Sequence, residues 1–159
     1  MTGDFPAAVL RVRDAASALS LPIDIKIMTQ PTRTAEEAAS ACGCDVAQIV
    51  KALVFKGAES GRNYLLLVSG KNRVNETGVA VALGEALERP RADHVREVTG
   101  FAIGGIPPFG HATPLRTFVD EDLLAFDLVW AAAGTPNAVF SCDPERLRAA
   151  IEAQVVSVG

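Results

Sequence analysis

The stretch GFAIGGIPPFGH, residues 100–111, places the tightest restriction on how this chain folds. It holds four glycines and two prolines in twelve residues. Glycine weakens helices and strands, and proline fixes φ and removes a backbone N–H, so we expect neither a helix nor a central strand here. Such a loop can hold several backbone amides in a concavity that binds an anion or oxyanion. A rigid structural corner between strands is the alternative, and the composition supports both.

Length and composition indicate one globular domain over residues 1–159. Of the 159 residues, 49% are hydrophobic and 21% are charged, which argues against disorder. No apolar run is long enough to cross a bilayer, and the N-terminus lacks the order of regions found in a signal peptide. We therefore expect a cytoplasmic protein with no membrane partner.

Hydrophobic patterning predicts interleaved helices and strands. A capping box over Thr34–Glu37 opens a helix that ends near Gly43, and Asp143-Pro144 opens the last helix. The apolar runs 52–55 and 64–68 indicate two buried strands joined as a hairpin. Further helices are expected over 6–19, 45–50, 75–87 and from Asp93 to Gly100, and strands over 23–27, 115–119, 126–132, 137–142 and 154–158, with a short helix from Asp120. This mixture favours a mixed-sheet α+β domain.

Charge and cysteine content narrow the possible functions. The net charge of −4 argues against nucleic-acid binding over the whole surface of the protein. Residues 51–96, however, hold eight basic and five acidic residues. That segment is either a local phosphate-binding surface or a solvated face. Cys42, Cys44 and Cys142 fit a reducing compartment, and the C-x-C spacing of Cys42 and Cys44 is not by itself a metal signature, so we expect no metal.

Four local features remain as candidates for chemistry, because the sequence has no P-loop, dinucleotide fingerprint, H-E-x-x-H or G-x-S-x-G motif. Lys51 stands where a helix pattern changes to a strand, and could hold a phosphate or a developing oxyanion, or simply extend to solvent. His111 is either a general base or a residue that fixes the loop. The segment 69–73 is a basic turn that either contacts phosphates or is merely solvated, and the segment 133–137 has the residue types of a structural turn.

Four stretches occur together in an order that resembles the YbaK family of aminoacyl-tRNA deacylases, a domain also inserted into bacterial prolyl-tRNA synthetases. They are TAEEAASACGCDVAQIVKALVFKG (34–57), LLLVSGKNRVN (65–75), TGFAIGGIPPFGH (99–111) and WAAAGTPNAVFSCDPERL (130–147). The resemblance implies the fold of that family, a single α+β domain with a mixed, partly barrel-like β-sheet flanked by helices.

The same resemblance implies a set of site residues. Lys51 matches the family's most important functional side chain. The glycine-rich loop and the Ala-Gly segment match the walls of the aminoacyl pocket, which assigns substrate binding to Gly104, Gly105, Ile106, Pro107, Gly110, His111, Ala133, Gly134 and Thr135.

The expected activity is trans-editing: hydrolysis of small amino acids such as alanine, cysteine or 2-aminobutyrate from mischarged proline tRNA. No cofactor is expected, because an aminoacyl ester is already activated and needs only positioned water and oxyanion stabilisation. The expected partners are the tRNA acceptor end and, transiently, prolyl-tRNA synthetase. The alternatives are a non-catalytic nucleic-acid-binding module with the same fold and a hydrolase of some other small activated ester.

Overall fold

The structure, a computed structural model, describes residues 5–30 and 32–159. The α-helices are α1 (Ala7–Ala18), α2 (Ala35–Cys42), α3 (Glu76–Leu83), α4 (Ala92–Thr99) and α5 (Pro144–Ala150), and two short 3₁₀ helices are η2 (Val46–Gln48) and η3 (Glu121–Ala125). The strands are β1 (Asp24–Ile27), β2 (Val50–Gly57), β3 (Asn63–Ser69), β4 (Leu87–Glu88), β5 (Arg116–Asp120), β6 (Val129–Ala132), β7 (Ala138–Cys142) and β8 (Gln154–Val156).

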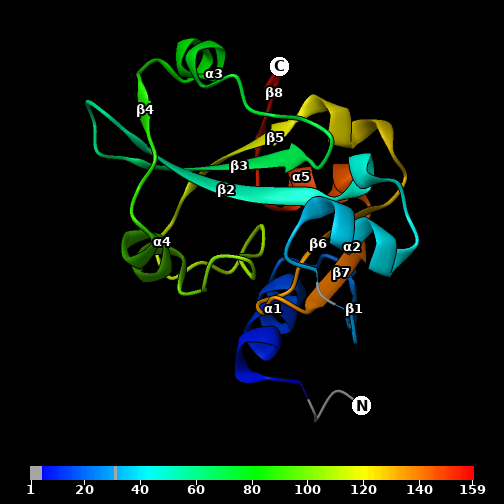
Figure 1. Cartoon of the computed structure of the whole chain (residues 1–159). Coiled ribbons are helices and arrows are strands. Elements are labelled where there is room, and N and C mark those ends of the chain that lie inside the picture. The colour runs from blue at the N-terminus through cyan, green and yellow to red at the C-terminus, as the bar shows by residue number, and fades with distance from the viewer. Residues whose placement is uncertain (1–4, 31) are drawn as a thin grey trace.

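The strands form two sheets (Figure 1). The smaller sheet is antiparallel, in the order β1-β7-β6. The larger sheet has the order β4-β2-β3-β5-β8, and it is mixed because β3 pairs with β2 antiparallel and with β5 parallel. A single parallel bridge between Ile49 and Trp130 links the start of β2 to β6. Two sheet edges therefore meet at this bridge.

The larger sheet is buried on both faces, which explains the continuous apolar run of β3. Leu65 and Leu67 face the main core, shared with α1, β6, β7 and the glycine-rich loop. Leu66 and Val68 face a second cluster, where Val79 of α3 covers the sheet. Helix α2 packs separately on Trp130 and its neighbours in the smaller sheet. The glycine-rich loop thus belongs to the main core.

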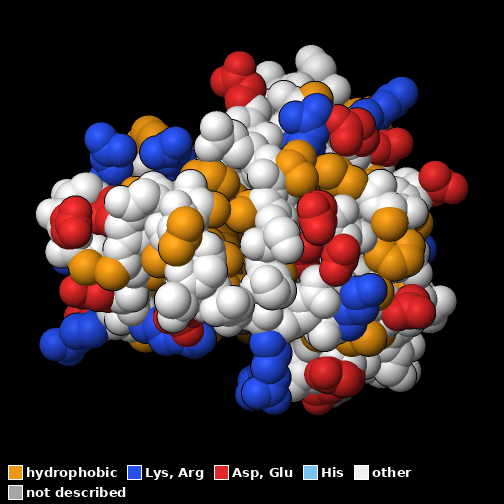
Figure 2. Space-filling model, turned by 90° about the horizontal axis from the view of Figure 1, so that it is seen from above, with side chains coloured by type: hydrophobic (Ala, Val, Ile, Leu, Met, Phe, Trp, Pro, Cys, Tyr) orange, Lys and Arg blue, Asp and Glu red, His pale blue; other side chains and the backbone are white. Residues whose placement is uncertain are grey.

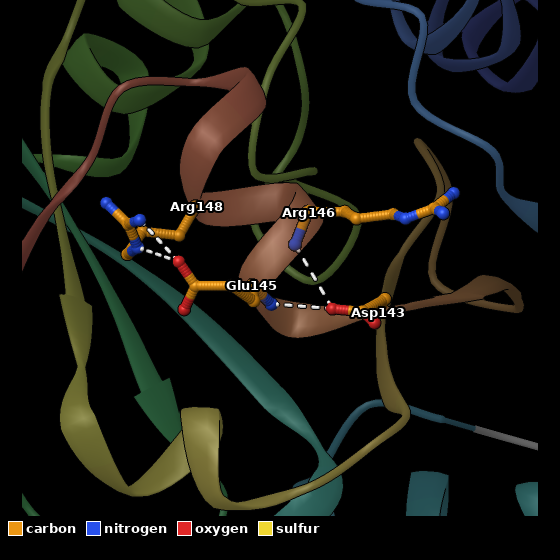
Figure 3. Close-up of polar contacts among 4 residues, drawn as sticks. All are labelled: Asp143, Glu145, Arg146 and Arg148. Carbon is orange, nitrogen blue, oxygen red and sulfur yellow. Dashed lines mark hydrogen bonds and ion pairs between the residues drawn. The ribbon is translucent and has the colours of Figure 1, made fainter.

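Capping side chains fix where several helices begin. Thr34 and Glu37 form the expected capping box at the start of α2. At α5 the Asp143 carboxylate accepts hydrogen bonds from the backbone N–H groups of Glu145 and Arg146, and Arg148 forms an ion pair with Glu145 (Figure 3). The contacts of Thr34 and Asp143 satisfy backbone N–H groups that the first helical turn leaves free.

The expected α+β class is confirmed, and so is the antiparallel hairpin of β2 and β3. Several element boundaries differ from the prediction. The helix expected over 75–87 ends at Leu83, because Gly84 adopts a left-handed conformation with φ of 89°. Asp93 does not cap α4, since Arg91 occupies the N-cap position.

Two further expected boundaries are wrong. The strand expected from residue 126 begins at Val129, because Phe126 ends the 3₁₀ helix η3. The helix expected over 45–50 is the three-residue helix η2, because β2 already starts at Val50.

Surface charge is mixed on the face seen in Figure 2, where basic and acidic side chains alternate. No helix among the described residues is long and apolar enough to span a membrane.

Candidate functional site

A cavity of about 520 Å³ lies where β2 and β6 diverge from the Ile49–Trp130 bridge. Its volume is within the range of small-molecule sites. Strand β2 supplies one wall, the smaller sheet and the start of α2 supply another, and the glycine-rich loop closes it. The lining residues are Thr32, Arg33, Thr34, Ala35, Ala38, Ile49, Val50, Lys51, Ala52, Leu53, Val54, Phe55, Arg89, Pro90, Val95, Ile103, Gly104, Ile106, Trp130, Ala131, Ala132, Ala138 and Val139.

Lys51 lines this cavity from the second position of β2 and is half-buried. Its Nζ donates a hydrogen bond to the backbone carbonyl of Asn72. The Asn72 amide in turn donates to Asp120 and Asp122, at 2.8 Å each. Asp120 is buried and also accepts the Ser69 N–H at 3.0 Å. A chain of hydrogen bonds therefore fixes the position of the ammonium group.

The surroundings of Lys51 lower its pKa. Burial, which penalises the charged form, is the main cause, and Arg73 adds to it. The carboxylates of Glu36 and Asp120 act in the opposite direction. The ammonium group is consequently less stable as a cation than that of a solvent-exposed lysine.

Gly104 and Ile106 bring the glycine-rich loop to the cavity. The N–H of Gly105 is bonded to the carbonyl of Ala102. The N–H groups of Gly104 and Ile106 donate to no acceptor among the described residues. Two unpartnered backbone donors thus belong to residues that line the cavity, an arrangement that suits an oxyanion.

The Ala133–Thr135 segment lies directly behind this loop. Gly134 donates its N–H to the carbonyl of Gly105 at 3.0 Å. A Cβ on Gly105 would lie 2.8 Å from the Gly134 carbonyl carbon, so the two backbones touch. The structure therefore brings Gly105 and Gly134 together, as the sequence motifs suggest, but Gly105, Ala133, Gly134 and Thr135 support the wall rather than line the cavity.

His111 lies at the far end of the loop. Its Nε2 is 2.7 Å from the carbonyl of Pro107. Since a carbonyl only accepts, Nε2 carries the proton and donates. Burial lowers the pKa of His111, which favours the neutral ring. Pro107, Gly110 and His111 do not line the cavity, and this contact favours the loop-fixing role over the general-base role.

The charged side chains that line the cavity are cationic: Arg33, Lys51 and Arg89, of which Arg89 also forms an ion pair with Glu76 at 2.8 Å. None of the lining residues is Asp, Glu, His, Cys or Ser. The remaining lining is largely apolar, with Trp130 and Val139 on the smaller sheet. The cavity thus favours an anionic ligand with an apolar part, and the described lining offers no thiol, imidazole or carboxylate for catalysis.

The thiols lie outside this site. Burial raises the pKa of Cys42 to about 11 and that of Cys142 to about 12, so both are protonated at neutral pH.

Several lining residues were not singled out from the sequence. Trp130 lies inside the stretch 130–147 that resembles the family. A large aromatic side chain just before the turn at 133–137 could have identified it as a lining residue. Arg33 and Arg89 reach the cavity from before α2 and after β4, and nothing local in the sequence indicates that these segments meet.

The chain belongs to the aminoacyl-tRNA editing domain family, whose model matches residues 29–150. This confirms the resemblance inferred from the sequence motifs. A crystal structure of a candidate trans-editing enzyme for prolyl-tRNA synthetase shares 46% identity with the chain, covers 98% of both chains and superimposes with a TM-score of 0.91.

Two curated relatives extend the comparison. YwhH of Bacillus subtilis, a protein without an assigned function, is 28% identical over 124 residues, which is 78% of each chain. The proline–tRNA ligase of Bacillus licheniformis is 31% identical over 110 residues. That match covers 69% of this chain but 18% of the ligase.

Proposed function

We propose that this protein is a trans-editing deacylase, which hydrolyses the ester between a small, wrongly attached amino acid and the 3′ end of proline tRNA. The observation that carries the proposal is the cavity, in which an apolar lining is combined with charges that are only cationic. An aminoacylated tRNA end has this character, since phosphates adjoin a base and a small acyl group. Membership of the editing family supports the same assignment.

The reaction needs no nucleophile from the protein. A water oxygen attacks the ester carbonyl carbon, the bond from that carbon to the ribose oxygen breaks, and the water proton passes to the departing oxygen. The products are the free amino acid and a tRNA with a free 3′ hydroxyl. The neighbouring ribose hydroxyl is positioned to assist in such a substrate, which is consistent with a lining that lacks catalytic carboxylates and imidazoles.

Negative charge develops on the ester oxygen during this attack. In our proposal the free N–H groups of Gly104 and Ile106 stabilise that oxyanion. The Lys51 ammonium, fixed on the Asn72 carbonyl, holds the terminal phosphate or the oxyanion itself. Gly105, Ala133, Gly134 and Thr135 keep the loop in place, as do Pro107, Gly110 and His111 from its far end.

The small side chains that line the cavity are consistent with a substrate whose acyl group is small. Alanines at 131, 132 and 138 line the smaller-sheet wall, and Ile106 closes the loop side. A pocket of fixed size admits alanine, cysteine or 2-aminobutyrate and rejects the bulkier, cyclic proline, which acts as a second sieve after the synthetase. Transient association with prolyl-tRNA synthetase would deliver the substrate directly.

Deacylation assays on a panel of mischarged tRNAs test this proposal. We expect hydrolysis of alanyl-, cysteinyl- or 2-aminobutyryl-tRNA for proline, with correctly charged prolyl-tRNA left intact as the matched control. Absence of turnover across the panel would contradict it. Salt-sensitive tRNA binding without any turnover would instead identify a non-catalytic binding module.

A further inference from the structure

The hydrogen-bond register of β2 determines which of its backbone groups are free. Gly57 donates its N–H to Arg62, and the Ile49 carbonyl accepts from Gly70, so both pairs are hydrogen-bonded pairs of the hairpin. In an antiparallel ladder such pairs alternate. Leu53 and Phe55 therefore bond to β3, opposite Leu66 and Tyr64.

The backbone groups of Ala52 and Val54 consequently point away from β3. The neighbouring strand β4 pairs only with Lys56 and Gly57. At the other end, the bridge to Trp130 stops at Ile49. Among the described residues no neighbouring strand or loop bonds the backbone of Ala52 or Val54 on this side, and both residues line the cavity.

We propose that this open edge of β2 binds the base of the terminal adenosine: the Ala52 carbonyl accepts from the exocyclic N6 amino group, and the Val54 N–H donates to ring nitrogen N1. This inference rests on the proposed function, because it takes the ligand to be the 3′ end of a tRNA. An adenine presents a donor and an acceptor side by side on its Watson–Crick edge. A carbonyl at one residue and an N–H two residues later present the complementary pair.

The dimensions of the edge favour a base over other occupants. The free stretch is bounded by β4 and by the Ile49–Trp130 bridge, which leaves too few groups for an added peptide strand. An α-ammonium group has donors only, so it would leave the Val54 N–H unpaired. The aliphatic side chains of Ile106 and Val139 and the ring of Trp130 suit the faces of a flat aromatic ring.

Binding of adenosine analogues to the native protein tests the proposal. The probe is adenosine with alanine attached at the 3′ position through an amide, which resists hydrolysis. We expect the 1-deaza and the 6-desamino forms of this probe to bind about 10-fold more weakly, since each loses one hydrogen bond and leaves a backbone group unpaired. The 7-deaza form keeps its Watson–Crick edge and serves as the matched control, with unchanged affinity. Equal binding of the 1-deaza form, or no binding of the adenine probe, would overturn the inference.

A backbone variant locates the contact. Val54→Pro removes an N–H that bonds nothing in the protein, and proline is tolerated at such edge positions. We expect this variant to bind the adenine and 1-deaza probes equally. Amide exchange on the native protein gives the same information without a mutation: the probe should protect the Val54 N–H, while Leu53 and Phe55, already bonded to β3, stay unchanged. No protection at Val54 in a protein that binds the probe would overturn the inference.

The two proposals fail separately. Base-dependent probe binding without deacylation of any mischarged tRNA would remove the proposed function and keep the adenine site. Equal deacylation of mischarged tRNAs ending in adenosine and in 1-deazaadenosine would keep the proposed function and remove the adenine site.

Discussion

At the scale of single residues, Lys51 is expected to dominate the chemistry. Lys51→Ala should lower kcat/KM for alanyl-tRNA about 10²–10³-fold, the usual effect of removing one oxyanion or phosphate partner. Steady-state deacylation, corrected for spontaneous ester hydrolysis, measures this. Retention of full activity by Lys51→Ala would contradict the assignment.

The pH dependence of the wild-type rate follows from the lowered pKa of Lys51. The protonated form carries the useful charge, so activity should fall on the alkaline side, with a midpoint below that of an ordinary lysine. Lys51→Arg keeps its charge at every accessible pH, and its residual activity should show no such fall. Identical profiles for the wild type and Lys51→Arg would count against this explanation.

Asn72 should act through Lys51. Asn72→Ala removes the amide that anchors this turn to Asp120 and Asp122. We expect kcat to drop about 10-fold with a smaller change in KM, because the carbonyl that holds the ammonium loses its fixed position. Asn63→Ala is the matched control, since that half-buried amide bonds His94 instead. Equal effects of the two variants on kcat would show that Asn72 has only a general structural role.

At the scale of elements, the contact between the Ala133–Thr135 segment and α1 leaves no room for a residue larger than glycine at position 134. Gly134 has φ of 103°, and a Cβ there would lie 2.6 Å from the carbonyl oxygen of Ala8. Gly134→Ala should therefore lower the free energy of unfolding by about 2–4 kcal/mol. Gly84→Ala, with φ of 89° but no atom within 4 Å, should cost only about 1 kcal/mol. Chemical denaturation distinguishes them, and equal losses would contradict the steric explanation.

Glu85 connects the segment after α3 to the β2–β3 turn. Its carboxylate accepts from Ser60 and Tyr64 hydroxyls at 2.6 Å, and the Ser60 contact is the main reason that its pKa falls to about 2. A lowered carboxyl pKa stabilises the fold above its unfolded value of 4.5, and this contribution is lost as the pH falls toward 2. Glu85→Gln should thus lower the denaturation midpoint at pH 7 but have little effect at pH 2. A constant difference across that range would refute this.

Much at this scale was predictable from local chemistry. The capping box at Thr34, the proline after Asp143 and the hairpin of two apolar runs are short-range patterns, and the structure contains them. Boundaries near Gly84 and Phe126 were wrong, because the apolar pattern continues past the point where the backbone turns. In the site, Lys51, Gly104 and Ile106 reach the cavity as the motifs suggest. Arg89 and the open edge of β2 depend on pairing between distant segments, which no local pattern reveals.

At the scale of the whole molecule, tRNA affinity should depend on a few cations. The net charge is −4, so under the proposed function we expect binding to rely on the cations that line the cavity, Arg33, Lys51 and Arg89. Three contacts to a single-stranded end predict a slope of about −2 for log K against log salt. Arg33→Ala should make that slope less negative by about 0.7, while Arg146→Ala on α5 should leave it unchanged. A much steeper slope would indicate a larger phosphate-binding surface.

The alanines that line the cavity also bear on how readily this site could be adapted. Ala38, Ala131 and Ala138 are buried side chains that line it from α2 and from the smaller sheet. A larger side chain there would reduce the cavity volume and would also press on the core, because Ala131 and Ala138 pack in it. Under the proposed function, an engineer who wanted an editing domain for another misacylation would begin at these three positions, because they set how much room the acyl group has.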